Sequence, residues 1–238
     1  MKEQVKELQI AAEGWKPARV LTWAFETFGD TVAISSAFGA EGMVLIDIAS
    51  RLRRKFRLFT LDTEFLFLET YNLMDQVEQR YGVTIERVFP ILSPEKQEEV
   101  HGAELWKYAP DQCCNLRKVE PLQRKLSELQ AWITSIRRDQ TATRARAGKI
   151  EWDEKFGLVK INPIADWSSE QVWQYIREHD VPFNALHERS YPSIGCTHCT
   201  RAVLPGEDPR AGRWAGSSKT ECGLHIIQPS ISTPVAGA

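Results

Sequence analysis

Hydrophobic and polar positions along the chain predict strands that are each followed by a helix. The short apolar run Thr31–Ser35 predicts a buried strand, and Met43–Leu52 follows it with the spacing of a helix. The unit repeats with a strand at 56–61, a helix at 64–81 and a strand at 83–89. Such alternation is typical of a mostly parallel sheet flanked by helices, so the expected fold class is α/β.

The pattern continues more weakly through the middle of the chain. It predicts a helix over Asp111–Gln130, strands at Ala131–Ile136 and Leu158–Ile161, and a helix that begins near Asp166. Ligands of such sheets bind at the carboxyl ends of the strands, which is where we expect the functional loops.

The last part of the sequence is irregular. After Pro182 the chain becomes rich in Pro, Gly and Arg, and the segment from Gln228 to the end is expected to be a frayed tail. We therefore expect one α/β domain over residues 1–204 and a flexible C-terminal segment over residues 205–238. The sequence contains no internal repeat.

Composition narrows the class of protein. The chain has 238 residues, is 42% hydrophobic and carries a formal charge of −2, which gives no reason to expect nucleic acid or an anionic membrane as partner. No apolar stretch approaches the ~20 residues that span a bilayer, and Met1–Lys6 does not begin a secretory signal. Five cysteines in a chain of this size do not make a disulfide scaffold. A cytoplasmic enzyme is the expectation.

Four of the five cysteines form two tight pairs. Cys113 and Cys114 are adjacent, and Cys196 and Cys199 form a Cys-x-x-Cys. Four soft thiolates suit a [4Fe–4S] cluster or a zinc ion. The adjacent pair favours the cluster, because separate irons can each receive one thiolate, whereas zinc ribbons prefer two Cys-x-x-Cys-like knuckles.

The fifth cysteine, Cys222, stands apart in a polar segment. A lone late cysteine is commonly a small core residue, but Lys219 and His225 lie within three positions of it. Positive neighbours stabilise the thiolate, which is the reactive form. Cys222 is therefore the candidate nucleophile.

These motifs together resemble a known enzyme family. The Cys-Cys pair, the stretch SIGCTHCTR at 193–201 and the box ECGLH at 221–225 are similar to those of assimilatory adenylyl-sulfate (APS) reductases of the bacterial iron–sulfur type. Their relatives include the phosphoadenylyl-sulfate (PAPS) reductases. The resemblance runs over roughly Thr31–His225, and it implies a fold like that of the adenine-nucleotide α-hydrolases.

The resemblance also implies a reaction. Cys222 would attack the sulfur of APS, displace AMP and become an S-sulfocysteine. Thioredoxin or a glutaredoxin-like reductant would then release sulfite, as the step of sulfate assimilation that leads to cysteine biosynthesis. This protein reductant and APS are the expected partners, and self-association into a homo-oligomer is left open by the sequence.

Other site residues follow from the same resemblance. Lys118 would lie beside the cluster, Arg210 and Arg213 would bind the sulfate, and His225 is the terminal histidine of its box. At the nucleotide end, the loop that starts at Ser36 and the strand end at Leu61 match the family, with Phe38 and Gly42 among the departures from it. The stretch 137–141 resembles the loop that closes the ligand crevice.

Three alternatives stay open. PAPS reduction, alone or beside APS reduction, uses the same chemistry, and arginines at 137–146 would suit a 3′-phosphate. An ATP pyrophosphatase of the PP-loop kind shares the fold, but its loop reads Ser-Gly-Gly-x-Asp-Ser, and residues 36–41 do not. A zinc-stapled binding module without catalysis would leave Cys222 unexplained.

Overall fold

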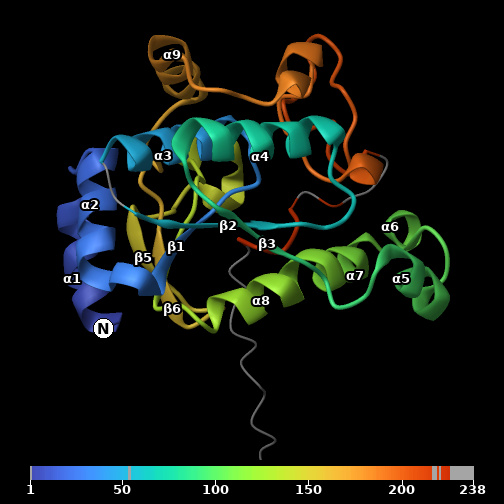
Figure 1. The fold of residues 1–238 in the computed structure, drawn as a ribbon, viewed down its shortest axis with the longest axis horizontal. Helices are drawn as coiled ribbons and strands as arrows, with labels where there is room; N and C mark the ends of the chain where they lie inside the picture. The colour runs from blue at the N-terminus through green and yellow to red at the C-terminus, as the bar shows by residue number, and fades with distance from the viewer. Residues whose placement is uncertain (1, 53–54, 216–218, 220, 226–238) are drawn as a thin grey trace, which may run out of the picture.

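A computed structural model describes residues 2–52, 55–215, 219 and 221–225. Figure 1 shows a central sheet with helices on both faces. The strands are β1 (Val32–Ser35), β2 (Arg57–Leu61), β3 (Ile85–Val88), β4 (Ala131–Ile133), β5 (Ile150–Asp153) and β6 (Leu158–Ile161). The helices are α1 (Lys2–Ala12), α2 (Pro17–Phe28), α3 (Ala40–Arg51), α4 (Leu68–Tyr81), α5 (Pro94–His101), α6 (Leu105–Tyr108), α7 (Pro110–Cys114), α8 (Glu120–Leu126) and α9 (Ser169–His179).

The strand order reverses at the middle of the sheet. The order is β3-β2-β1-β4-β6-β5, and all neighbours are parallel except β5, which pairs antiparallel with β6. The chain builds outward from β1 through β2 to β3, and then returns to the other side of β1 with β4. The strand order therefore reverses between β1 and β4, which is where ligands of such sheets bind.

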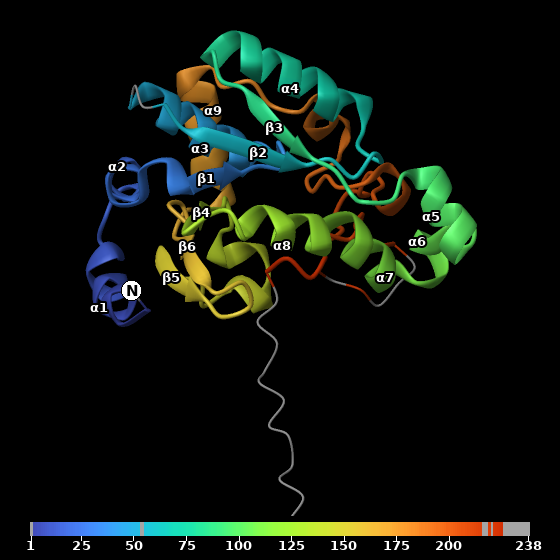
Figure 2. The same cartoon turned by 60° about the horizontal axis from the view of Figure 1, so that its bottom comes forward.

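Because successive side chains of a strand point to opposite faces, each face of the sheet has its own hydrophobic core. On one face, Val32 and Ile34 of β1 join the apolar sides of α2, α3, α4 and α9. On the other face, Ala33, Phe59 and Trp132 pack with Leu122 and the rest of α8. Figure 2 shows α8 beneath the sheet and α4 above it. Leu224, near the end of the described chain, also packs against the core on the α8 side.

The expected α/β class is confirmed, and most predicted elements are present. The predicted helix over Asp111–Gln130 is instead α7, a π-helical turn (η2, Asn115–Val119) and α8, ending at Leu126. The sequence reading missed β5, a four-residue antiparallel strand, and the short helices α5 and α6. Such short polar elements give too few turns or alternations for a periodic signal.

The predicted division into 1–204 and 205–238 stays a prediction, and the expected frayed tail from Gln228 lies outside the described residues. Within the described part of the chain, no helix has the length and apolar character needed to cross a membrane.

Candidate functional site

The loop after β1 closes on itself and faces the loop after β4. Ser36 is buried, and its hydroxyl accepts a hydrogen bond from the backbone N–H of Phe38 at 3.0 Å. A Cβ at Gly42 would lie 2.5 Å from the Ser36 Oγ, so the family departure at Gly42 leaves room for this hydroxyl. Glu41, in the first turn of α3, accepts from Arg137 Nε at 3.1 Å. The two loops on either side of the reversal point are thereby joined.

The strand end at Leu61 leads directly to the Cys-x-x-Cys. Leu61 is the last residue of β2, and Asp62 after it is fully buried. The hydroxyl of Thr63 lies 3.4 Å from Cys196 Sγ, and Thr197 N donates to the Phe65 carbonyl at 2.8 Å. The predicted nucleotide end and the predicted cluster end of the site are therefore held against each other.

The four paired cysteines line one cavity. Cys113 and Cys114 come from α7, while Cys196 and Cys199 come from the turn η6 (Thr197–Cys199) and the residue before it. Burial raises the pKa of the Cys113 thiol to about 12 and that of Cys199 to about 11. Among the described residues, no group of three or more His, Cys, Asp or Glu side chains is arranged to hold a metal ion. The donor chemistry of the lining, four soft sulfurs, nevertheless suits the expected cluster.

Aromatic rings and a buried arginine form the rest of this cavity's wall. His198 stacks on Trp106 with ring centroids 3.9 Å apart, and Phe65 meets it edge-on. Arg117 is buried beside Phe65 and donates to Gln97 Oε1 at 2.8 Å and to the Thr63 carbonyl at 3.0 Å. Sequence reasoning passed over Arg117, whose only signal was its position beside Lys118.

Lys118 connects the four-cysteine cavity with the predicted nucleophile. It lies in η2 and lines the cavity. Burial would lower the pKa of Lys118, but its electrostatic interactions with Cys196 and Cys222 raise that pKa above its ordinary value. The same ammonium and the Thr63 hydroxyl hold the pKa of the Cys196 thiol below its ordinary value, although burial would raise it. Lys118 therefore stays cationic between the two kinds of cysteine.

One of the two predicted sulfate arginines, Arg213, is tied to the Cys-x-x-Cys by backbone pairing. Thr200 forms an antiparallel bridge with Arg213, Arg201 N donates to the Gly212 carbonyl at 2.9 Å, and Trp214 N donates to the Cys199 carbonyl at 3.0 Å. We call this pairing of 199–201 with 212–214 the backbone clip. The clip holds Arg213 beside the Cys-x-x-Cys segment.

The Arg213 guanidinium passes directly over a glycine. Its Nη1 donates to Ser193 Oγ and to the Ile194 carbonyl, both at 3.2 Å, while its Nε is buried and has no hydrogen-bond partner. A Cβ at Gly195 would lie 2.3 Å from Arg213 Nη2. Only glycine at 195 leaves this space to the guanidinium.

Glu221, the residue before Cys222, is bound by an anion-binding cluster. Its side chain is 3% exposed and accepts from Arg144 Nη2 at 2.9 Å and from the Thr141 hydroxyl at 3.2 Å. Arg210 Nη2 forms an ion pair with the same carboxylate at 3.5 Å. Burial lowers the pKa of Arg210, and Glu221 opposes that effect. Glu221 belongs to the box at 221–225, but the motif alone did not predict a role for its side chain.

Cys222 and the residues after it rest against the sheet. Cys222 is half-buried, and Lys155 Nζ donates to the Gly223 carbonyl at 2.7 Å. His225 stacks on Trp132 of β4 with centroids 5.7 Å apart. Burial, followed by the cations Lys160 and Arg144, holds the pKa of His225 well below its usual range. The imidazole is therefore neutral in this position.

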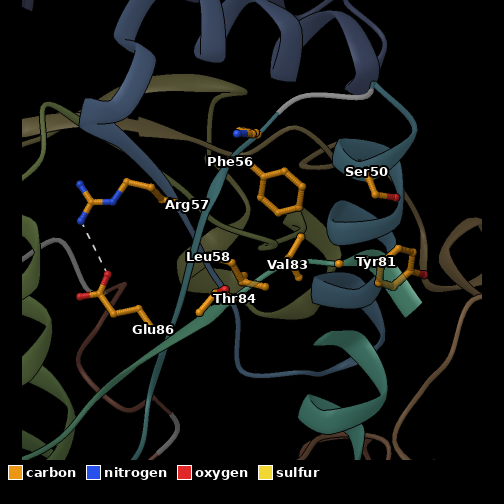
Figure 3. Close-up of a pocket in the computed structure, with 10 residues that line it drawn as sticks. Ser50, Phe56, Arg57, Leu58, Tyr81, Val83, Thr84 and Glu86 are labelled. Carbon is orange, nitrogen blue, oxygen red and sulfur yellow. Dashed lines mark ion pairs between the residues drawn. The ribbon is translucent and has the colours of Figure 1, made fainter. Parts of the chain in front are cut away.

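A larger hollow lies elsewhere and contains none of the predicted site residues. It is open and is lined by residues at the amino ends of β2 and β3 and by the end of α4, among them Phe56, Arg57, Tyr81 and Glu86 (Figure 3). The predicted residues instead gather around the carboxyl ends of β1, β2 and β4. Size alone would have pointed to the opposite end of the sheet from the predicted site residues.

Sequence similarity to known proteins shows the family of the chain. Residues 31–202 match the model of the phosphoadenosine phosphosulfate reductase domain. The chain is 48% identical to "Adenosine 5'-phosphosulfate reductase" of Shouchella clausii over 87% of its own length and 86% of the relative's. It is 49% identical to "Adenosine 5'-phosphosulfate reductase 2" of Bacillus subtilis, over 87% of this chain and 88% of the relative.

Solved structures give the same fold. A crystal structure of phosphoadenylyl-sulfate (PAPS) reductase from Candida auris, in a phosphate complex, is 34% identical and superposes with a TM-score of 0.75 over 84% of this chain and 98% of the other. The FMN adenylyltransferase of Candida glabrata superposes with a TM-score of 0.57 over 81% of this chain and 64% of the other, at 12% identity. At that identity the likeness concerns the fold alone.

Proposed function

Because the chain belongs to the phosphoadenosine phosphosulfate reductase family, we propose that it reduces APS to sulfite and AMP with electrons from thioredoxin. The observation that carries this proposal is the near-complete match to relatives named adenosine 5'-phosphosulfate reductase at 48–49% identity. The electrostatic interactions of Cys222 with Lys118 and Arg210 support it.

The first step would be a nucleophilic displacement at sulfur. The Cys222 thiolate attacks the sulfate sulfur of APS, an S–S bond forms, and the bond between this sulfur and the bridging oxygen breaks. AMP leaves with the electron pair of that bond, and the enzyme holds an S-sulfocysteine. Arg210 and Arg213 would bind the sulfate oxygens, while the Lys118 ammonium faces the thiolate.

The second step would be thiol–disulfide exchange. One thiolate of reduced thioredoxin attacks Cys222 Sγ and releases sulfite, which leaves a mixed disulfide. The second thiol of thioredoxin resolves this disulfide and restores the Cys222 thiol. The dithiol supplies two electrons, which balances the reduction of sulfate sulfur to sulfite. Since Cys222 must meet both APS and a protein reductant, the segment that carries it must have two positions.

The cavity lined by Cys113, Cys114, Cys196 and Cys199 would hold a [4Fe–4S] cluster. When bound, the cluster would supply a polarisable charged centre next to Lys118, and no electrons, because the thiols supply both. Arg117 and the ring of His198 would shield it from solvent. The cytoplasm, where thioredoxin keeps thiols reduced, is the compartment that suits this chemistry.

PAPS reduction is the second candidate, and the likeness to the Candida auris PAPS reductase favours it. APS is preferred here because the relatives named for APS are more similar in sequence. The test is to compare release of labelled sulfite from ³⁵S-labelled APS and PAPS, with thioredoxin as reductant. We expect kcat/KM for APS to exceed that for PAPS by about tenfold or more, as rejection of an unpaired charged group allows. Equal values would make it a dual-specificity reductase, and turnover of neither would end the proposal.

A further inference from the structure

The carboxylate of Glu221 occupies two arginines that an anionic substrate would need. It holds Arg144 Nη2 at 2.9 Å, pairs with Arg210 Nη2 at 3.5 Å and accepts from the Thr141 hydroxyl at 3.2 Å. The side chain of Glu221 is 3% exposed and that of Arg144 is 10% exposed. This is a desolvated contact, and ion pairs of this kind are not weakened by solvent as surface pairs are.

The cluster also has donor capacity that Glu221 does not use. Arg144 Nη1 donates to Gln140 Oε1 at 2.6 Å, but Arg144 Nε is buried and has no hydrogen-bond partner. The Nε of Arg213 is in the same condition. Buried donors are normally satisfied, and unsatisfied ones call for an explanation. A ligand with more acceptor oxygens than a carboxylate, such as a phosphosulfate, could engage donors that Glu221 leaves unpaired.

Glu221 and the substrate cannot both have these contacts. An N–H that donates to a carboxylate is not available to a phosphosulfate oxygen, and a carboxylate next to that dianionic group would repel it. One of the two anions must leave. Since Glu221 precedes Cys222 directly in the chain, a displacement of its side chain also moves the backbone that carries the nucleophile.

We propose that Glu221 is an internal substitute for the anionic group of the substrate. In free enzyme its carboxylate holds Arg144 and Arg210 together, and APS displaces it when it binds. The displacement couples the arrival of substrate to the movement of Cys222 from a half-buried position. This inference rests on the proposed function, since it takes APS as the competing anion.

The experiment measures binding without turnover. ³⁵S-labelled APS is titrated by equilibrium dialysis against Cys222→Ser enzyme, alone and combined with Glu221→Gln. The matched control combines Cys222→Ser with Glu86→Gln, because Glu86 also pairs with two cations, Lys125 at 2.5 Å and Arg57 at 3.6 Å, away from the site. Glu221→Gln should tighten APS binding by about tenfold, since it removes a like charge at ion-pair distance, and Glu86→Gln should not.

A second variant keeps the test independent of how well Glu221→Gln folds. Thr141→Val removes one hydrogen bond to Glu221 and keeps every charge. It should tighten APS binding by about twofold, in line with the net value of one hydrogen bond.

Unchanged or weaker APS binding by both Glu221→Gln and Thr141→Val would overturn the inference and leave the proposed function intact. Failure of the Cys222→Ser parent itself to bind APS would instead refute the proposed function, and the inference with it. The two failures are distinguishable, because only the second appears in the parent.

Discussion

Replacing Gly195 by alanine should damage substrate binding while the protein still folds. The added Cβ would lie 2.3 Å from Arg213 Nη2 and 2.6 Å from Cζ. Ordinary van der Waals contact begins near 3.4 Å, so the guanidinium must retreat by about 1 Å. A flexible side-chain end can move that far without disturbing the core, and the fold should persist.

The size of the effect follows from the bonds that the shift breaks. Arg213 Nη1 would lose its hydrogen bonds to Ser193 Oγ and the Ile194 carbonyl, both 3.2 Å long, at about 0.5–1.5 kcal/mol each. A misplaced guanidinium also loses a charge-assisted bond to sulfate, worth about 1.5–3 kcal/mol. We expect kcat/KM for APS to fall roughly 10–100-fold, with a loss of at most about 3 kcal/mol in the free energy of unfolding.

The assay is the initial rate of ³⁵S-sulfite release over a range of APS concentrations, together with urea unfolding of the same samples. Gly14→Ala is the control, because a Cβ there has open space and the residue lies far from the site in the chain. A Gly195→Ala enzyme whose kcat/KM stays within twofold of the Gly14→Ala enzyme would refute the reasoning. Arg213 would then not need the position that it has here.

Three further predictions use other parts of the site. Cys222→Ser should abolish sulfite release while leaving the visible absorbance of the anaerobic protein unchanged, and residual turnover would remove Cys222 as nucleophile. Anaerobically purified protein should absorb broadly near ~400 nm and contain about four irons per chain, and Cys113→Ser should reduce both; colourless protein with zinc would refute the cluster. The pKa of His187 is lowered by burial, so the unfolded chain takes up this proton first. His187 should therefore contribute a loss of stability of up to ~1.4 kcal/mol per pH unit as the pH drops below about 6.5, in addition to the loss from His198 and His225, whose pKa values are also lowered. Urea unfolding at pH 5.5 and 7.5 checks this, and an equally steep loss in His187→Leu would contradict it.

Local periodicity made most of the fold predictable. The apolar run before Ser36 and the helical spacing after it are strong signals, because a buried parallel strand and an amphipathic helix each repeat a pattern several times. β5 was missed because its partner is the neighbouring hairpin strand β6 and its alternation covers four residues only. The π-helical turn that carries Lys118 has no sequence signature, since its five residues would also suit an ordinary helix.

The site was predictable in its residue types and not in its contacts. The paired cysteines, Lys118 and the arginines could be named from motifs. The contacts between site residues could not be predicted. Thr63 and Cys196, for example, are 133 positions apart, and contacts between residues so far apart in the sequence leave no local pattern. Glu221 illustrates the limit best. Its neighbour Cys222 drew attention by its chemistry, whereas the partners that give Glu221 its meaning, Arg144 and Thr141, come from a distant loop.

The backbone clip has a consequence for how such an enzyme would mature. Trp214 N donates to the Cys199 carbonyl and Arg201 N donates to the Gly212 carbonyl, so a displacement of the Cys199 backbone is passed on to Arg213. For an enzyme assembled around iron on these thiols, a chain that has not yet received its iron would also have a misplaced sulfate arginine. Such a chain would bind APS only after the iron has been inserted. A cell short of iron would hold a reserve of chains that do not engage APS, and sulfur uptake would follow iron supply without any dedicated regulator.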